Sequence, residues 1–225
     1  MYYKVASVDA IIIYFGDIIT DEISQQVLSL YYNLKARDID GFIEIIPSYT
    51  TLYIEFDTLL HNHSELFTQI EQWADEIDSA EYLQGRDMSI PTYFDPSVGL
   101  DLERVASLHQ MSIDEVVDIY TKRSYRVYTI GFAPGYAYMG SVDEQISTPR
   151  LSTPRAQIPE GSVAIANTQC AVYPQASPGG WNIIGRTYIK MFDRAIDGLS
   201  YLRVGDSVRF EPICLEEYLA RGGVV

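Results

Sequence analysis

The feature that most constrains the fold is a change in hydrophobic periodicity halfway along the chain. Before Tyr125, apolar residues recur with either a two-residue or a 3.6-residue period, the patterns of strands and helices. From Tyr125 onward the helical period is lost, and eleven of the fifteen glycines lie at or beyond Gly131. Short strands separated by glycine and proline are typical of a barrel or a sandwich. The 225 residues are therefore expected to form two domains of different class.

Residues 1–95 predict a small α/β domain. Strands are expected over 8–15, 42–46, 52–56 and 90–94. Thr20 and Ser64 are N-cap residue types, and each precedes an apolar stripe of helical spacing. The stripe of the second helix is Phe67, Ile70, Trp73 or Ala74, and Ile77. The resulting order β-α-β-β-α-β is the ferredoxin-like pattern.

Residues 96–124 predict two short helices that connect the two domains. Ser112 and Glu115 form a capping box at the start of the second helix. Two adjoining helices could also indicate a DNA-binding motif. The second helix, however, exposes Asp114, Glu115 and Asp118, and a helix that enters a DNA groove needs the opposite charge. A connector is the favoured interpretation.

The charge of the chain is distributed unevenly. The total is −15, and residues 1–100 hold 4 basic and 17 acidic side chains. Residues 122–209 hold ten Lys and Arg against six Asp and Glu, a net charge of +4. An acidic protein repels nucleic-acid phosphates and anionic lipids, so neither nucleic acid nor membrane is expected as a partner. The arginine-rich stretch favours a small anionic ligand, although chance unevenness between two domains remains an equal alternative.

The cysteine and histidine patterns predict neither a disulfide bond nor a metal centre. Cys170 and Cys214 form no disulfide framework, and no zinc spacing is present. His61 and His63 lack a third candidate ligand nearby. No apolar run approaches the roughly 20 residues of a membrane span. We expect a soluble, cytoplasmic protein with reduced thiols.

The first of three unusual segments is the loop of residues 131–140. Its glycines permit positive φ, and Pro134 has a fixed φ, so the loop should be stiff. Phe132 and Tyr136 could then line a pocket. A purely structural connection between strands, with the rings packed on the barrel, is equally compatible with the sequence.

The second segment repeats Thr-Pro-Arg, ending at Arg150 and again at Arg155. The prolines predict extended backbone, and arginine suits bidentate recognition of a carboxylate or phosphate. An odd separation in an extended chain places the two guanidinium groups on opposite faces. One arginine could serve a ligand while the other pairs internally, and the sequence does not decide which.

The third segment contains Gln169, Tyr173 and the turn Pro178-Gly179-Gly180, followed by Trp181 and Arg186. Bare glycine amides can form an anion-binding concavity. Walker, GxGxxG, GxSxG and HExxH motifs are all missing from the sequence. The pattern therefore indicates a subunit that contributes half of a site, or a binding protein.

These segments resemble the B-subunit family of 5-oxoprolinase, also called allophanate hydrolase subunit 1, which includes the kinase inhibitor KipI. The resemblance is carried by residues 131–136, the doubled Thr-Pro-Arg, Val172-Tyr-Pro174, the run 177–187 and the closing segment 204–213. The chain departs from the family pattern where Asn167 and Ala171 replace glycines.

The resemblance implies an α+β protein: a ferredoxin-like domain over 1–95, a helical connector over 96–124 and a cyclophilin-like β-barrel over 125–225. It implies a C subunit with a similar barrel, a ligand cleft between the two barrels, and a further A subunit. The assembly would convert 5-oxo-L-proline to L-glutamate with hydrolysis of ATP. A magnesium ion that accompanies ATP would be shared with the partner subunits. The expected catalytic residues are Arg150, Arg155 and Arg186. The expected substrate-binding residues are Phe132, Pro134, Tyr136, Gln169, Tyr173, Pro178, Gly179, Gly180 and Trp181.

Two alternatives share this fold. A KipI-like protein would dock on a sensor histidine kinase and inhibit it. Urea or allophanate chemistry is the other, and it would be expected in a larger multidomain chain. The arginines and the Pro-Gly-Gly turn favour the enzyme component, because a ligand site needs them and docking does not.

Overall fold

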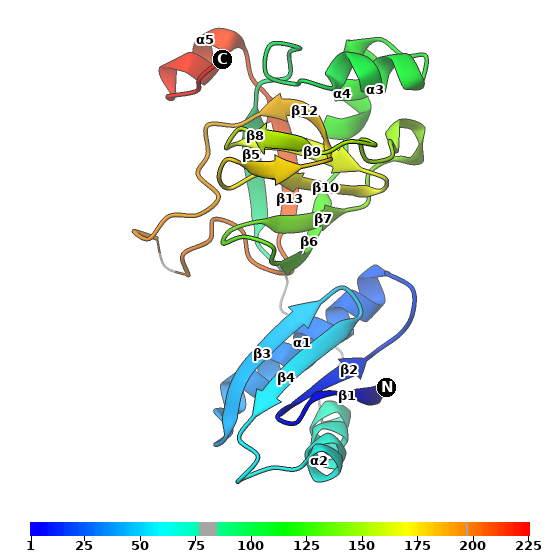
Figure 1. The fold of residues 1–225 in the computed structure, drawn as a ribbon, viewed down its shortest axis with the longest axis vertical. Helices are drawn as coiled ribbons and strands as arrows, with labels where there is room; N and C mark the ends of the chain where they lie inside the picture. Colours follow the sequence, from blue (N-terminus) through cyan, green and yellow to red (C-terminus); the bar gives the residue numbers. More distant parts are fainter. Residues whose placement is uncertain (77–84, 197) are drawn as a thin grey trace. The chain divides into compact units, whose positions relative to one another are not determined.

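The computed structural model describes residues 1–76, 85–196 and 198–225. The chain divides into two compact units, Met1–Gln84 and Gly85–Val225 (Figure 1). Each unit has its own sheet and its own buried apolar core, which confirms the expected α+β class. The division falls earlier in the chain than the expected end of the first domain at residue 95.

The first unit is an antiparallel sheet of four strands, in the order β1-β2-β4-β3, with two helices. Its elements are β1 (Tyr2–Ser7), β2 (Ala10–Tyr14), α1 (Asp21–Arg37), β3 (Phe42–Ser48), β4 (Thr51–Phe56) and α2 (His63–Asp75). Its core joins side chains of both helices to one face of the sheet, including Leu30 of α1, Ile70 of α2 and Ile54 of β4.

The two helices begin at side chains that accept a backbone N–H. Thr20 caps α1 as predicted, because its hydroxyl accepts the N–H of Ile23 at 3.2 Å. The cap of α2 is Asn62 rather than Ser64, since the Asn62 side chain accepts the N–H of Glu65 at 3.0 Å. Ile77, the last residue of the predicted stripe, lies outside the described residues.

The strand predicted over 90–94 does not belong to the first unit. It is β5 (Asp87–Thr92), which pairs in parallel with β13 (Ser207–Pro212) in the second unit. The position beside β2 that a closing ferredoxin-like strand would occupy is instead taken by β1, antiparallel to β2. Either strand would cover the edge of β2, so periodicity alone could not choose between them. Ile90 is fully buried in the core of the second unit.

The second unit is built on a seven-stranded, nearly closed sheet in the order β12-β9-β10-β7-β6-β13-β5, with the ribbon β11-β8 beside it. Its remaining strands are β6 (Tyr125–Ile130), β7 (Ala137–Gly140), β8 (Arg155–Ile158), β9 (Ser162–Ala166), β10 (Gln169–Val172), β11 (Ser177–Gly179) and β12 (Asn182–Arg186). The helices are α3 (Leu102–Leu108), α4 (Ile113–Thr121), a 3₁₀ turn (Glu144–Ile146) and α5 (Leu215–Ala220). The apolar run 189–192 would suit a strand, but no strand is formed by these described residues, and Phe192 makes only an isolated bridge to Ser200.

The two helices expected to connect the domains instead pack on the barrel. Leu102 and Val105 of α3 and Val116 of α4 are fully buried in the same core as Val127 and Met139 of the sheet. Figure 1 shows both helices at one end of the curved sheet. The capping box of Ser112 and Glu115 is present as predicted.

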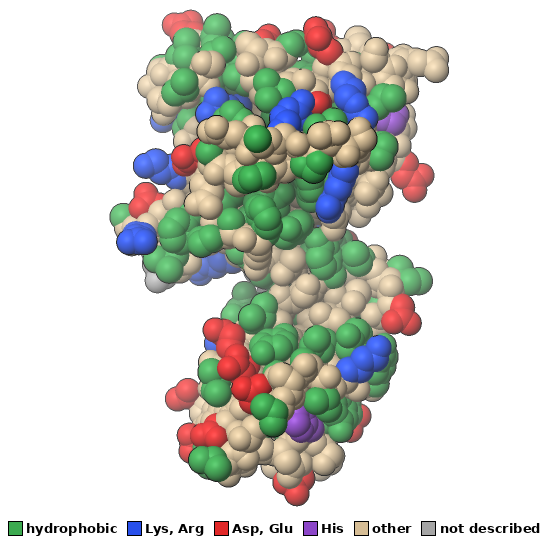
Figure 2. Space-filling model, viewed as in Figure 1, with side chains coloured by type: hydrophobic (Ala, Val, Ile, Leu, Met, Phe, Trp, Pro, Cys, Tyr) green, Lys and Arg blue, Asp and Glu red, His purple; other side chains and the backbone are tan. Residues whose placement is uncertain are grey.

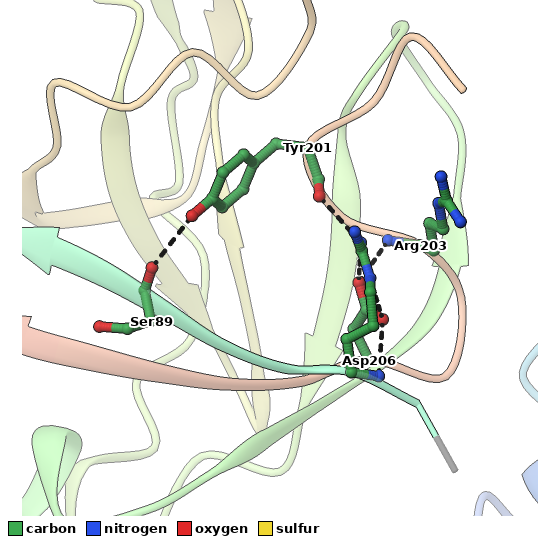
Figure 3. Close-up of polar contacts among 5 residues, drawn as sticks. Ser89, Tyr201, Arg203 and Asp206 are labelled. Carbon is green, nitrogen blue, oxygen red and sulfur yellow. Dashed lines mark hydrogen bonds and ion pairs between the residues drawn. The ribbon is translucent and has the colours of Figure 1, made fainter. Parts of the chain in front are cut away.

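A buried carboxylate holds the start of β5 against the loop before β13. Asp206 is 2% exposed and accepts hydrogen bonds from the Arg86 side chain, the Arg86 N–H and the Arg203 N–H (Figure 3). Arg86 also donates to the carbonyl of Tyr201 at 3.0 Å, and the Tyr201 hydroxyl donates to the carbonyl of Ser89 at 3.3 Å. These contacts make β5 an integral strand of the barrel unit.

Candidate functional site

Strand alternation gives the barrel sheet two different faces. In β9, Val163 and Ile165 join the barrel core, whereas Ala164 and Ala166 point to the opposite, outer face. The outer face also carries four ring side chains in mutual contact, which we call the aromatic face. They are Tyr136, Tyr138, Tyr173 and Trp181. The small alanines leave room for these rings to lie close to the sheet.

The rings of the aromatic face are fixed by hydrogen bonds as well as by packing. The hydroxyl of Tyr173 accepts hydrogen bonds from the hydroxyl of Tyr136 and from the backbone N–H of Trp181. Gly179 allows this arrangement, because a Cβ at that position would lie 2.3 Å from the Tyr173 hydroxyl oxygen. Burial raises the pKa of Tyr136 and Tyr173 above the usual tyrosine value. Both hydroxyls therefore stay protonated near neutral pH.

Arg150 lies over the aromatic face. Its guanidinium carbon is 5.6 Å from the centroid of the Trp181 ring, within the range of a cation–π contact. Its positive charge partly offsets the effect of burial on the pKa of Tyr136, Tyr138 and Tyr173. Within the part of the chain that the structure describes, no carboxylate forms an ion pair with Arg150. Arg150 is thus an exposed cation beside hydroxyl donors.

Arg155, in contrast, has an internal partner. Its two terminal nitrogens donate to the two oxygens of Asp101, each at 2.8 Å, and the side chain of Asp101 is 4% exposed. Asp101 also accepts the N–H of Ile183 at 2.8 Å. The ion pair therefore joins β8, β12 and the start of α3, and its geometry is that of a structural contact.

Arg186 is held by backbone carbonyls elsewhere on the barrel. Its Nε donates to Glu160 at 2.9 Å and its Nη1 to Val224 at 3.0 Å. It lines a hollow of about 210 Å³ together with Lys190 and the C-terminal segment. The contacts of Arg186 are separate from those of Arg150 and Arg155, so the structure does not gather the three predicted arginines around a shared ligand space.

The other predicted residues lie around the aromatic face. Phe132 is 69% exposed, has a φ of 73°, and touches the Tyr136 ring with 5.3 Å between centroids. Pro134 in the same loop and Pro178 in the Pro-Gly-Gly turn are exposed. Gln169 lies on the same side of β10 as Tyr173. Gly180 accepts the N–H of Leu151 at 2.7 Å, which ties the turn to the Arg150 segment.

Several side chains at the site were not predicted as functional. Tyr138 could have been found, because it is two residues from Tyr136 and a strand places both on one face. The sequence gives no indication that Asn182 is functional, since it is one polar residue within a strand. Asp101 and Arg104 lie one helical turn apart at the start of α3, which the sequence indicated only as a connector.

Cys170 and the two histidines of the first unit lie in other environments. Cys170 is fully buried in the barrel core, and burial raises the pKa of its thiol well above the usual range, so it is no nucleophile. His61 and His63 each contact a backbone carbonyl and the ring of Phe56. Within residues 1–76, 85–196 and 198–225, no three His, Cys, Asp or Glu side chains form a group that could hold a metal ion.

In the same ranges, no helix is long and apolar enough to cross a membrane.

The fold and the site define a class: two-unit α+β proteins whose barrel presents an aromatic face with an arginine above it. Residues 1–202 match the family model described as carboxyltransferase domain, subdomain C and D. The chain is 35% identical over 221 residues to the B subunit of 5-oxoprolinase from Bacillus subtilis strain 168, covering 94% of this chain and 92% of that protein. It is 37% identical over 179 residues to the B subunit of 5-oxoprolinase from Escherichia coli O157:H7, covering 78% and 80% respectively. The chain therefore belongs to the B-subunit family of 5-oxoprolinase.

Solved structures share the fold of this chain. The crystal structure of TTHA0988 has a TM-score of 0.81 and 30% identity, covering 91% of this chain. This chain spans only 40% of the length of TTHA0988. The crystal structure of PH0987 from Pyrococcus horikoshii has a TM-score of 0.58 and 37% identity, covering 96% of this chain and 100% of that one. The TTHA0988 match indicates that the same fold also occurs as part of a longer chain.

Proposed function

We propose that this chain is the B subunit of an ATP-dependent 5-oxoprolinase, which converts 5-oxo-L-proline to L-glutamate, and that it contributes half of a site between subunits. The observation that carries the proposal is the placement of Arg150: a cation without a carboxylate partner among the described residues, above a face of rings and tyrosine hydroxyls. Membership of the B-subunit family of 5-oxoprolinase supports the choice of reaction.

The chemistry of the substrates suits this face. 5-Oxoproline carries a carboxylate and a five-membered lactam ring, and ATP carries phosphates. A guanidinium forms strong, charge-assisted hydrogen bonds with a carboxylate or a phosphate. The partly exposed ring of Tyr138, beside the buried Trp181 ring, offers an apolar surface for the lactam. The Tyr173 hydroxyl accepts from Tyr136 and keeps its own proton, which it can donate to the lactam carbonyl oxygen. A lactam is a poor electrophile, and phosphorylation of that oxygen by ATP creates a good leaving group. This chain's part is to bind and orient the anion.

The three predicted arginines receive different roles in the proposal. Arg150 binds the anion. Arg155 supports the site through its ion pair with Asp101, and Arg186 holds the C-terminal segment through backbone carbonyls. No step on this chain is assigned to the magnesium ion that accompanies ATP, because the described residues offer no cluster of carboxylates to hold it.

Phe132 supports the part of the proposal that concerns a partner. A phenylalanine with positive φ is strained, and here it presents a large apolar ring to solvent. Such a ring gains stability when a second protein covers it. We assign Phe132 to the contact with the C subunit, beside the aromatic face. Figure 2 shows apolar side chains on the barrel unit with Lys and Arg side chains around them.

The proposal is tested by reconstitution. The chain is co-expressed with the products of neighbouring genes, and 5-oxoproline-dependent release of ADP and formation of glutamate are measured. The complete assembly should be active, and the purified chain alone or the assembly without it should be inactive. An assembly that releases ADP equally well without this chain would refute the proposal. So would a chain that assembles with no such partner but binds and inhibits a sensor histidine kinase.

A further inference from the structure

Arg150 is held in place by the backbone of its own segment. The carbonyl of Thr148 accepts the N–H of Asn167 at 2.7 Å, and the N–H of Leu151 donates to Gly180 at 2.7 Å. Between these two anchors, the carbonyl of Pro149 accepts a hydrogen bond from the side chain of Asn182 at 3.0 Å. Of these three anchors, only the one at Asn182 is made by a side chain.

Every polar atom of the Asn182 amide is used, although the residue is fully buried. Its nitrogen faces the carbonyls of Pro149, Ile165 and Thr148, at 3.0, 3.2 and 3.4 Å. Its oxygen accepts a hydrogen bond from Arg104 of α3. The amide orientation is fixed by this chemistry, because three carbonyls need a donor and a guanidinium needs an acceptor. A buried amide with all its partners rigidifies the segments that it joins.

We infer that Asn182 is a positioning residue: it holds the Pro149 carbonyl so that the next side chain, Arg150, lies over the Trp181 ring. Only the expected effect of Asn182 on enzyme activity rests on the proposed function; the positioning of Arg150 does not. Asn182 follows Trp181 directly in the chain, so one short stretch supplies both the ring under Arg150 and the tether of the Arg150 segment. A small displacement of Pro149 would move the guanidinium off the ring.

The test uses the fluorescence of Trp181 and needs no substrate. In a Trp73→Phe background, Trp181 is the single tryptophan of the chain, since the sequence has two. Arg150→Ala should raise the acrylamide quenching constant of Trp181, because the guanidinium no longer covers the ring. Asn182→Asp keeps the volume and an acceptor for Arg104 but removes the donor to Pro149. It should raise the quenching constant to the level of Arg150→Ala.

The double variant separates positioning from a general structural effect. If Asn182 acts through Arg150, adding Asn182→Asp to Arg150→Ala changes the quenching constant no further. Arg104→Met is the matched control, because it removes the other partner of the same amide and should leave the constant at the parent value. Asn182→Ser, smaller and neutral, answers the same question if the aspartate variant does not fold. A parental quenching constant in the Asn182 variants, or additive effects in the double variant, would overturn the inference.

Activity then provides a second readout. In the reconstituted assembly, Asn182→Asp should raise the KM for the anionic substrate, with a smaller effect on kcat, and the increase should vanish in an Arg150→Ala background. If quenching responds as expected but no assembly is active, the positioning inference stands and the proposed function fails. If the assembly is active but the Asn182 variants leave the quenching constant unchanged, the proposed function stands and the positioning inference fails.

Discussion

At the residue scale, Arg150 and Arg155 show how one sequence motif produces two different environments. Both follow Thr-Pro, and an odd separation in an extended chain predicts that they face opposite ways. The two guanidinium groups have different partners, because one lies over Trp181 and the other pairs with Asp101. Bends at Ser152 and Thr153 interrupt the extended backbone between them, so strand alternation alone does not explain this difference. Which arginine pairs could not be predicted, because Asp101 is 54 residues from Arg155 and reaches it only through the fold.

The two arginines should therefore differ in their effect on stability. Arg155→Ala leaves the buried carboxylate of Asp101 without its cation and should lower the free energy of unfolding by about 3 kcal/mol. Arg150→Ala removes an exposed side chain and should change that free energy by less than about 0.5 kcal/mol. Urea unfolding at neutral pH, followed by circular dichroism, measures both. Equal losses of stability would show that the Asp101 pair is not the structural contact described here.

The two cysteines should differ in reactivity. Cys214 is exposed, whereas Cys170 is buried in the barrel core with a raised thiol pKa. A thiol reagent should label one cysteine in the native protein and both in denaturant, because only the thiolate reacts. Peptide mass spectrometry identifies the labelled site. Rapid native labelling of Cys170 would contradict its burial.

The buried tyrosines should make the protein sensitive to alkali. Burial raises the pKa of Tyr125 and Tyr136 in the folded state above the unfolded value of about 10. Their stabilising contribution is complete below that value and is lost as the pH rises above it, by about 1.4 kcal/mol per pH unit for each tyrosine. Unfolding free energies between about pH 9 and pH 11 measure the slope, and Tyr136→Phe should make it shallower. A slope that Tyr136→Phe leaves unchanged would contradict the burial of this hydroxyl.

At the element scale, the strands and helices were mostly predictable and their pairing was not. Caps such as Thr20 and the Ser112 capping box follow from local sequence, because the hydrogen bonds span three residues. The partner of β5 is β13, which lies more than a hundred residues further along the chain. No local pattern encodes such a choice, so the sequence alone predicts β5 in the first sheet, whereas it pairs in the second.

This correction makes a prediction about the boundary of the barrel unit. A chain of residues 85–225 keeps β5 and should fold cooperatively. A chain of residues 96–225, which starts just after the expected end of the first domain at residue 95, loses Ile90 from the core and the whole β5–β13 pairing. Truncating one buried isoleucine to alanine alone costs about 2–5 kcal/mol, so the shorter chain should be less stable by more than about 4 kcal/mol. Indistinguishable urea unfolding curves for the two chains would show that β5 is dispensable.

At the scale of the whole molecule, the α+β class and the family were predictable from the sequence, and the composition of the site was predictable in part. The aromatic rings follow from strand spacing in loops rich in glycine and proline. Arg104, Asp101 and Asn182 could not be assigned, because they act through contacts that only the folded barrel creates. The net positive stretch 122–209 includes Arg150 and the aromatic face, so the uneven charge and the candidate site fall in the same unit.

The central claim is that Arg150 is the cation of a half-site and Arg155 is not. The most direct measurement is the turnover of reconstituted assemblies that carry Arg150→Ala, Arg155→Ala or the control Lys122→Ala. Lys122 is an exposed residue at the C-terminal end of α4. Each assembly is measured at a temperature at which its variant is folded. Arg150→Ala should lower 5-oxoproline-dependent ADP release on the order of 10²-fold, whereas the other two retain turnover within a few-fold of the parent. Full turnover of Arg150→Ala, or an equal loss in Arg155→Ala, would contradict the account.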